Sequence, residues 1–173
     1  MSLLRFLGLG SSSAKRDAHE SETVHRIASQ LERLDPQQAK FLAAFAYVLA
    51  RVANADFEID ATETAEMEAA VKRIAHLAEA EATLVVQIAQ SQAKNLGGTQ
   101  DYVVTRQFRQ ISTREQRGEL LQCLYAVAAA DGSIRSEESA EIVKIAEELG
   151  FTRAEAVSLR AQYREQLAEF QNR

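Results

Sequence analysis

The same pattern occurs at two places 75 positions apart, "LARVANADFEIDATETAEM" (Leu49–Met67) and "LYAVAAADGSIRSEESAEI" (Leu124–Ile142). Both pass from an apolar run through Ala-Asp-x-x-Ile-x-x-x-Glu into a charged run. The identical pairs are Leu49/Leu124, Val52/Val127, Ala53/Ala128, Ala55/Ala130, Asp56/Asp131, Ile59/Ile134, Glu63/Glu138, Ala65/Ala140 and Glu66/Glu141. Helical periodicity alone aligns apolar positions, but it does not align Asp with Asp and Glu with Glu across a corner. We therefore predict an internally repeated α-hairpin, at about 36–78 and 111–152.

The four recurring carboxylates allow two interpretations. As corner chemistry, each Asp bonds to amides in the turn and each Glu lies in the first turn of the next helix, where the macrodipole favours negative charge. As a binding site, the two corners face each other and hold a divalent cation. Four hard oxygen ligands suit Ca²⁺, Mg²⁺ or Mn²⁺, whereas zinc is disfavoured because the corners lack His and Cys. The predicted metal ligands are Asp56, Glu63, Asp131 and Glu138, and the carboxylates that could complete a shell are Glu58, Asp60, Glu66 and Glu141.

Outside the corners, apolar residues recur at helical spacing, and no sustained period-two run with turn signals occurs. The spacing predicts an all-α fold of seven to eight helices built from two duplicated α-hairpin halves. The expected helices cover about 20–34, 36–53, 62–77, 80–96, 99–111, 112–130, 136–149 and 153–170. Expected start signals are Asp35 before Pro36, a Ser112/Glu115 capping box, Ser136 as a cap, and "TRAE" from Thr152. Gly97 and Gly150 are the expected helix-ending glycines.

The chain has 173 residues, a formal net charge of −5 and one cysteine. This charge leaves no domain-wide basic surface, so nucleic acid is not an expected partner. Cys123 lies in the apolar run "LLQCLYAVAAA" and is predicted to be a buried small hydrophobe. A single cysteine cannot form an internal disulfide, which suits a cytoplasmic location.

The N-terminal sequence "MSLLRFLGLGSSSAKRD" is apolar and then polar. We expect residues 1–18 to be a flexible tail and 19–173 a single helical domain. The apolar part is interrupted and too short to span a bilayer. Weak membrane-surface contact through Leu3, Leu4, Phe6 and Leu7 is one expectation, and a disordered or self-packing tail is the other.

No catalytic motif is present in the sequence. The three histidines are scattered, with no H-x-x-x-H pair, and no P-loop or dinucleotide fingerprint occurs. The three consecutive serines lie in a linker and not on a strand-to-helix elbow. We therefore predict no catalytic residues and no enzymatic activity. The alternative is a metal-dependent small enzyme that uses the duplicated carboxylates.

The paired corners "ADFEIDATE" and "ADGSIRSEE", each preceded by a long apolar helix, resemble the signature of the tellurite-resistance TerB family. This family is related to the N-terminal region of DjlA-type membrane co-chaperones. The similarity extends over roughly 35–170. The first corner departs from the pattern because Phe57 stands where the second has Gly132, the usual family residue for the tight turn.

The resemblance implies a helical bundle whose duplicated hairpins bring their acidic corners together. It also implies a role in stress responses to tellurite and other toxic agents, within cytoplasmic complexes at the inner membrane face. The resemblance also implies that the acidic cluster binds a divalent cation. The expected function is therefore a non-enzymatic interaction module that has an unidentified protein partner.

Overall fold

The computed structural model describes residues 18–52, 61–93, 100–130 and 132–171. These residues form an all-α bundle, which confirms the predicted fold class. The described part contains nine α-helices and one 3₁₀ turn. The helices are α2 (Ala18–Glu32), α3 (Pro36–Val52), α4 (Ala61–Ala75), α5 (Glu79–Ala93), α6 (Gln100–Ile111), α7 (Arg114–Ala128), α8 (Ser136–Glu148), α9 (Arg153–Ala161) and α10 (Ala168–Gln171), with η1 (Arg164–Gln166) before the last.

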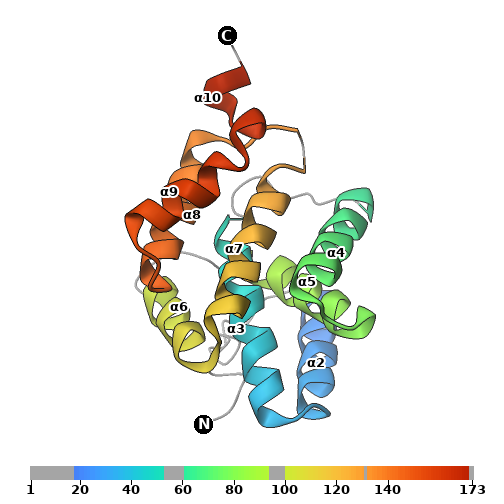
Figure 1. Cartoon of the computed structure of the whole chain (residues 1–173). Helices are drawn as coiled ribbons and strands as arrows, with labels where there is room; N and C mark the ends of the chain where they lie inside the picture. The colour runs from blue at the N-terminus through green and yellow to red at the C-terminus, as the bar shows by residue number, and fades with distance from the viewer. Residues whose placement is uncertain (1–17, 53–60, 94–99, 131, 172–173) are drawn as a thin grey trace.

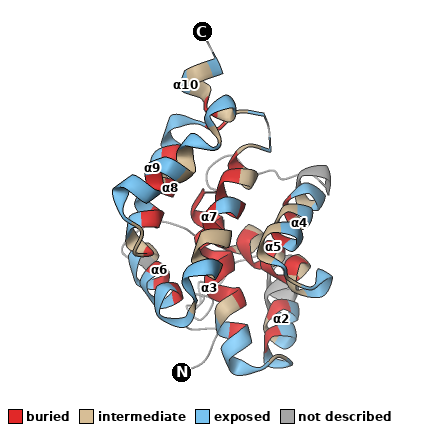
Figure 2. Ribbon diagram, viewed as in Figure 1, coloured by how far each residue is buried: buried red, intermediate tan, exposed pale blue. Residues whose placement is uncertain are grey.

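Helices α3 and α7 occupy the centre of the bundle (Figure 1). On one side α2, α4 and α5 cover them, and on the other side lie α6, α8 and α9. Buried residues concentrate on these two central helices (Figure 2). Every residue of α3 from Leu42 to Val52 is buried, as expected for a helix that is apolar on most sides.

Helix starts follow the local signals at two predicted places. At α3 the Asp35 carboxylate accepts hydrogen bonds from the N–H groups of Gln37 and Gln38, at 2.9 and 3.2 Å. At α9 the Thr152 hydroxyl accepts from the N–H of Glu155, and the Glu155 carboxylate accepts from the N–H of Thr152 at 2.7 Å. Both predicted caps are confirmed.

The predicted Ser112/Glu115 capping box is wrong by one position. Thr113 is the N-cap of α7, and its partner is Gln116, whose side-chain oxygen accepts from the Thr113 N–H at 2.8 Å. Both pairs match the capping-box pattern in sequence. The Ser112 hydroxyl instead donates to the Phe108 carbonyl of α6, so this residue belongs to the end of the preceding helix.

The helix predicted over 153–170 ends early. The segment that follows it bridges back to Ile134. Helix α9 ends at Ala161, and Leu167 then forms a parallel bridge with Ile134. The Ile134 N–H donates to the Gln166 carbonyl at 2.7 Å, and the Ala168 N–H donates to the Ile134 carbonyl at 3.0 Å. Leu167 is buried, and a backbone bridge to Ile134, not a continuous helix, places it there.

Helix α8 ends in a Schellman motif. Gly150 has φ of +91°, its N–H donates to the Glu147 carbonyl, and the Phe151 N–H donates to the Ala146 carbonyl. A β-carbon at Gly150 would lie 2.8 Å from the Arg109 guanidinium. The predicted role of Gly150 is confirmed, whereas Gly97 lies outside the described residues.

Replacing Gly150 with alanine should destabilise the fold by about 1–2 kcal/mol, because alanine resists a positive φ. The matched control is Gly118→Ala within α7, where an added β-carbon meets nothing within 4 Å. This substitution should stabilise by roughly 0.5–1 kcal/mol, since alanine has the higher helix propensity. Urea unfolding of both variants measures the difference in their free energies of unfolding. Equal unfolding midpoints would contradict the helix-ending role of Gly150.

Candidate functional site

Of the four predicted metal ligands, the structure describes the side chain of Glu138 alone. Asp56 and Asp131 lie outside the described residues, and so does the side chain of Glu63. Glu63 occupies the third position of α4, and Glu138 occupies the third position of α8. The Glu138 carboxylate accepts a hydrogen bond from the Arg135 N–H at 2.8 Å, where the chain enters α8. Arg135, and not the predicted Ser136, is the N-cap.

Within the described ranges, no group of three or more His, Cys, Asp and Glu residues is arranged to hold a metal ion. This search did not reach Asp56 or Asp131. The cation site at the corners therefore stays a prediction. The geometry of Glu138 matches the corner interpretation. Its carboxylate, in the first turn of α8, accepts a hydrogen bond from the N–H of the N-cap residue Arg135.

A buried arginine lies one residue before the end of α3. The Arg51 side chain is 2% exposed, although it belongs to the most apolar helix of the chain. It makes ion pairs with Glu141 and Glu148, both on α8. Its position therefore joins the central helix to the helix that follows the second acidic corner.

The guanidinium uses three of its nitrogen atoms. Nε donates to Glu141 Oε1 at 3.1 Å, and Nη2 contacts the same oxygen. Nη1 donates to Glu148 Oε2 at 2.7 Å and to the Thr105 hydroxyl of α6 at 2.6 Å. We call Arg51, Thr105, Glu141 and Glu148 the arginine clamp. It connects α3, α6 and α8 through one side chain.

Two further residues extend the arginine clamp along α6. The Thr105 hydroxyl donates to the Asp101 carbonyl at 2.9 Å, so it accepts from Arg51 while it donates one helical turn back. The Tyr47 hydroxyl, one turn before Arg51 on α3, donates to the Asp101 carboxylate at 3.1 Å. Burial raises the pKa of Tyr47 to about 12, and the bond to Asp101 acts in the same direction.

The electrostatic balance at Arg51 favours the ion pairs. Burial alone would lower the pKa of the guanidinium, but hydrogen bonds to Glu148 and Glu141 outweigh burial and raise it. Arginine suits this position because its planar guanidinium has five N–H donors and can bind several acceptors at once. Sequence reasoning did not identify this group. The available signal was a single cation inside the otherwise apolar run "FLAAFAYVLARVA".

Glu141 has a different role from the one considered for it. It was a candidate to complete a metal shell, but the structure pairs it with Arg51 and places Lys144 Nζ 3.8 Å from its second oxygen. Glu66, its counterpart in the first half, is exposed on α4. The two halves therefore use this shared glutamate differently.

Cys123 has no accessible nucleophilic chemistry. It is a free, fully buried cysteine on α7, and burial raises the pKa of its thiol to about 12. The thiol therefore stays protonated at neutral pH, whereas the thiolate is the reactive form. The predicted packing role of Cys123 agrees with this environment.

Replacing Arg51 with methionine should destabilise the fold by about 3 kcal/mol or more, because Glu148 would stay buried without its partner. Arg51→Lys should lose less, since it keeps the charge but cannot reach all three acceptors. Urea unfolding of the purified variants gives the free-energy differences.

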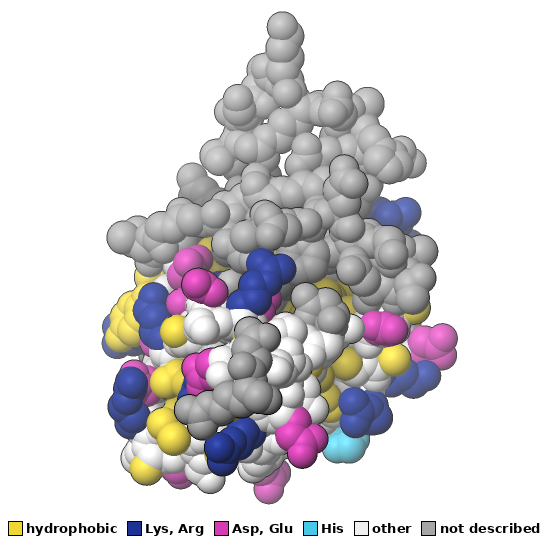
Figure 3. All heavy atoms as spheres, turned by 90° about the horizontal axis from the view of Figure 1, so that it is seen from above, with side chains coloured by type: hydrophobic (Ala, Val, Ile, Leu, Met, Phe, Trp, Pro, Cys, Tyr) yellow, Lys and Arg dark blue, Asp and Glu magenta, His cyan; other side chains and the backbone are white. Residues whose placement is uncertain are grey.

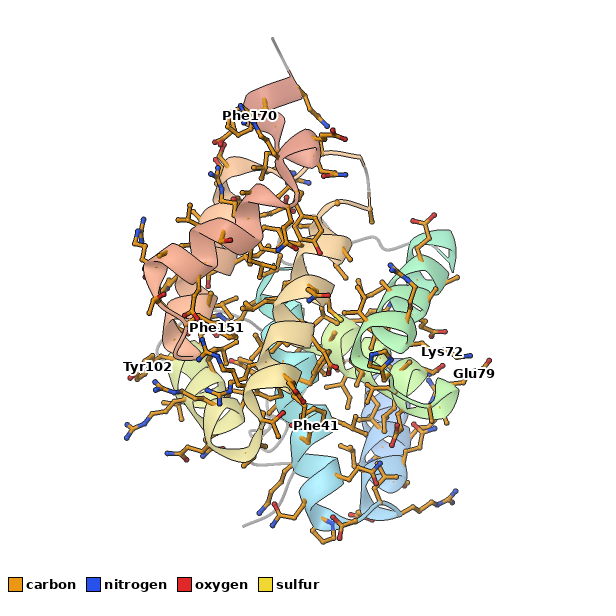
Figure 4. All side chains as sticks on the ribbon, in the orientation of Figure 1. Phe41, Lys72, Glu79, Tyr102, Phe151 and Phe170 are labelled. Atoms are coloured by element: carbon orange, nitrogen blue, oxygen red, sulfur yellow. The ribbon has the colours of Figure 1, made fainter. Side chains whose placement is uncertain are left out.

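The matched control for Arg51→Met is Lys72→Met. Lys72 and Glu79 form an ion pair of 3.4 Å on the outer surface, with both side chains more than half exposed (Figure 4). Such exposed pairs contribute about 0–1 kcal/mol. If both methionine variants unfold at the same urea concentration, the arginine clamp does not determine stability.

Comparison with known proteins identifies one family. The sequence model described as "Tellurite resistance protein TerB" matches residues 41–161. The matched region begins inside α3 and ends at the last residue of α9, so it contains both corners and the arginine clamp. No curated protein and no solved structure matches the chain. None of the helices in the described part combines the length and the apolar composition needed to cross a membrane.

Proposed function

Since the chain belongs to the TerB family, we propose that it is a non-enzymatic interaction module of a stress response, with its two acidic corners as the working surface. The observation that carries the proposal is the arginine clamp. It ties the last turn of α3, which leads into the first corner, to α8, which leaves the second corner. The first corner therefore begins, and the second corner ends, on helices that the arginine clamp joins.

We further propose that Asp56, Glu63, Asp131 and Glu138 bind a divalent cation such as Ca²⁺, Mg²⁺ or Mn²⁺. Four carboxylate groups supply the oxygen ligands that these hard cations prefer. Asp56 follows Arg51 by five positions in the chain, and Ser136, the first residue of α8, follows Asp131 by five.

Calcium or magnesium at millimolar concentration should raise the melting temperature, because a cation that binds only the folded state stabilises it by mass action. At tenfold the dissociation constant, the gain is about 1.4 kcal/mol, or roughly 3–6 °C for a chain of this size. Differential scanning calorimetry with each cation measures the shift, and isothermal titration calorimetry gives the affinity.

The variant that tests the site is Asp131→Asn, which should abolish the cation-dependent shift. The control is Glu68→Gln, because Glu68 has no counterpart in the second half, where Val143 occupies the equivalent position. A cation that produces neither heat nor a shift in the wild-type chain would refute the site. An ion that keeps an open coordination position beside a dry pocket would instead favour the enzymatic alternative.

The proposed location is the cytoplasm, in a complex at the inner membrane face. The described surface seen from above carries cationic and anionic side chains interspersed with one another (Figure 3). We assign weak membrane contact to the N-terminal apolar residues Leu3, Leu4, Phe6 and Leu7, with Lys15 and Arg16 near the headgroups.

Deleting residues 1–18 should abolish sedimentation of the protein with vesicles of phosphatidylglycerol and phosphatidylcholine, while leaving the melting temperature of the domain unchanged. The apolar residues supply buried area, and the basic pair supplies attraction to anionic lipid. The double variant Lys15→Ser and Arg16→Ser should weaken binding only to the anionic vesicles. Equal sedimentation of the full chain and the deletion variant would place the membrane contact elsewhere.

A further inference from the structure

Three arginines of α6 and α7 gather around the turn that ends α8, and we call Arg109, Arg114 and Arg117 the arginine triad. The turn consists of residues 149–151. Arg117 Nη1 donates to the carbonyl of its first residue, Leu149, at 2.9 Å, and Nε donates to a backbone carbonyl at the start of α7 at 3.1 Å. These two bonds hold the Arg117 guanidinium against the carbonyl end of α8.

The other two arginines lie against the next two residues of the turn. A β-carbon on Gly150 would come within 2.8 Å of the Arg109 guanidinium, so glycine allows this group to lie directly on the backbone. The Arg114 guanidinium lies over the Phe151 ring, 4.7 Å from the ring centroid. Phe151 is found at the end of α8, beside α6 and α7 (Figure 4). Three consecutive residues therefore place three guanidinium groups close together.

The arginine triad carries more positive charge than its neighbours offset. Within the described ranges, Arg109 and Arg117 form no ion pair, and Arg109 donates no hydrogen bond. Arg114 pairs with Glu155. The Glu155 carboxylate also caps α9, where it accepts from the Thr152 N–H at 2.7 Å. Three guanidinium groups and one carboxylate leave an excess of two positive charges.

Carboxylates close to the arginine triad in the chain are paired elsewhere or face away. Glu147 pairs with Arg153 at 3.0 Å, and Glu148 belongs to the arginine clamp. Successive residues of a helix turn by about 100°, so Glu115 lies on the side of α7 opposite to Arg117. The described neighbours therefore do not neutralise the excess charge.

The carbonyl end of α8 explains only part of this arrangement. A cation is favoured at the C-terminal end of a helix, which accounts for Arg117. The second and third cations repel it. Burial lowers the pKa of Arg117, and the charges of Arg109 and Arg114 lower it further. An anion bound among the three guanidinium groups would replace this repulsion with attraction.

Charge and geometry together select a phosphate group as the ligand. A guanidinium is a planar fork whose parallel N–H donors match two phosphate oxygens. A phosphomonoester carries a charge of about −1.5 to −2 at neutral pH, which matches the two excess positive charges. A carboxylate, or the phosphodiester of a phospholipid, carries only one. The Arg109 and Arg114 side chains are exposed and therefore accessible to a dissolved ligand.

We propose that the arginine triad binds the phosphate group of a soluble phosphomonoester. Arg109 supplies donors that no described residue accepts, Arg117 supplies the donors that the backbone carbonyls leave, and Arg114 adds charge at the edge. The inference goes beyond the proposed interaction module, because it adds a small-molecule ligand and uses none of the corner carboxylates. The cation experiment and the phosphate experiment can therefore fail independently.

The probe is inorganic phosphate, titrated into the full chain at constant ionic strength and without divalent cations. We expect saturable nuclear magnetic resonance shifts in the millimolar range, confined to the end of α6, the start of α7 and the turn at 149–151. The affinity should fall as the pH is lowered from about 8 to about 5.5, because phosphate takes up a proton in this range while arginine stays charged.

Sulfate is the matched control for the pH dependence, since it keeps two negative charges over the whole range. It should bind the arginine triad with nearly constant affinity. Glu155 stays ionised in this range, because hydrogen bonds from the Thr152 backbone and from Arg114 lower the pKa of its carboxyl group. The pH dependence therefore reports the charge of the ligand.

The variant Arg109→Gln should weaken phosphate binding about tenfold, because it removes one charge and its parallel donors. Arg109→Lys should weaken binding less, since lysine keeps the charge but lacks the planar fork. The matched control is Arg26→Gln, because Arg26 is an exposed arginine of α2, across the central helices from α6 (Figure 1). Both glutamine variants should keep the wild-type melting temperature, and Arg26→Gln should bind phosphate as the wild type does.

Three outcomes would overturn the proposal. The first is no saturable shift at tens of millimolar phosphate. If Arg109→Gln then also abolishes sedimentation with phosphatidylglycerol vesicles, the arginine triad contacts a membrane surface instead. The second is equal phosphate affinity of the wild-type chain and Arg109→Gln. The third is a pH dependence that sulfate shares, which would place the titrating group on the protein.

Discussion

The burial of one guanidinium constrains the arrangement of the second half against the central helix. Arg51 lies on the helix with the deepest burial, so its charge is tolerated only where acceptors from other helices surround it. Two carboxylates of α8 and a hydroxyl of α6 meet this requirement. A different rotation of α8 would leave the charge without partners, at a cost of several kcal/mol. The arginine clamp therefore selects one packing among those that apolar contacts alone would allow.

The same constraint relates the fold to the proposed function. The arginine clamp joins α3, which precedes the first acidic corner in the chain, to α8, which follows the second, and it pairs Glu141 with Arg51. Helix α8 thus carries the corner residue Glu138 in its first turn and both carboxylate partners of Arg51 further along.

Much of the fold could be predicted from the sequence because helix boundaries depend on local hydrogen bonding. Asp35 before Pro36, Thr152 before Glu155, and Gly150 each satisfy backbone groups within a few residues. The prediction failed where two local patterns overlapped, at Ser112 and Thr113, since only packing against α6 decides which hydroxyl caps α7. It also failed after Ala161, where a backbone bridge to Ile134 replaces the helix. Of the predicted ligands, Glu138 was placed correctly in a first helical turn.

The sequence by itself determined the all-helical class, the positions of most helix ends, the duplicated corner pattern and the resemblance to the TerB family. Each of these depends on residues close together in the chain or on a pattern repeated along it. Only the tertiary structure decided that Arg51 meets Glu141 and Glu148, which lie 90 and 97 positions away. It also decided that Leu167 bridges back to Ile134 through the backbone. These features arise from how the helices rotate and cross in the bundle, which the spacing of apolar residues does not specify.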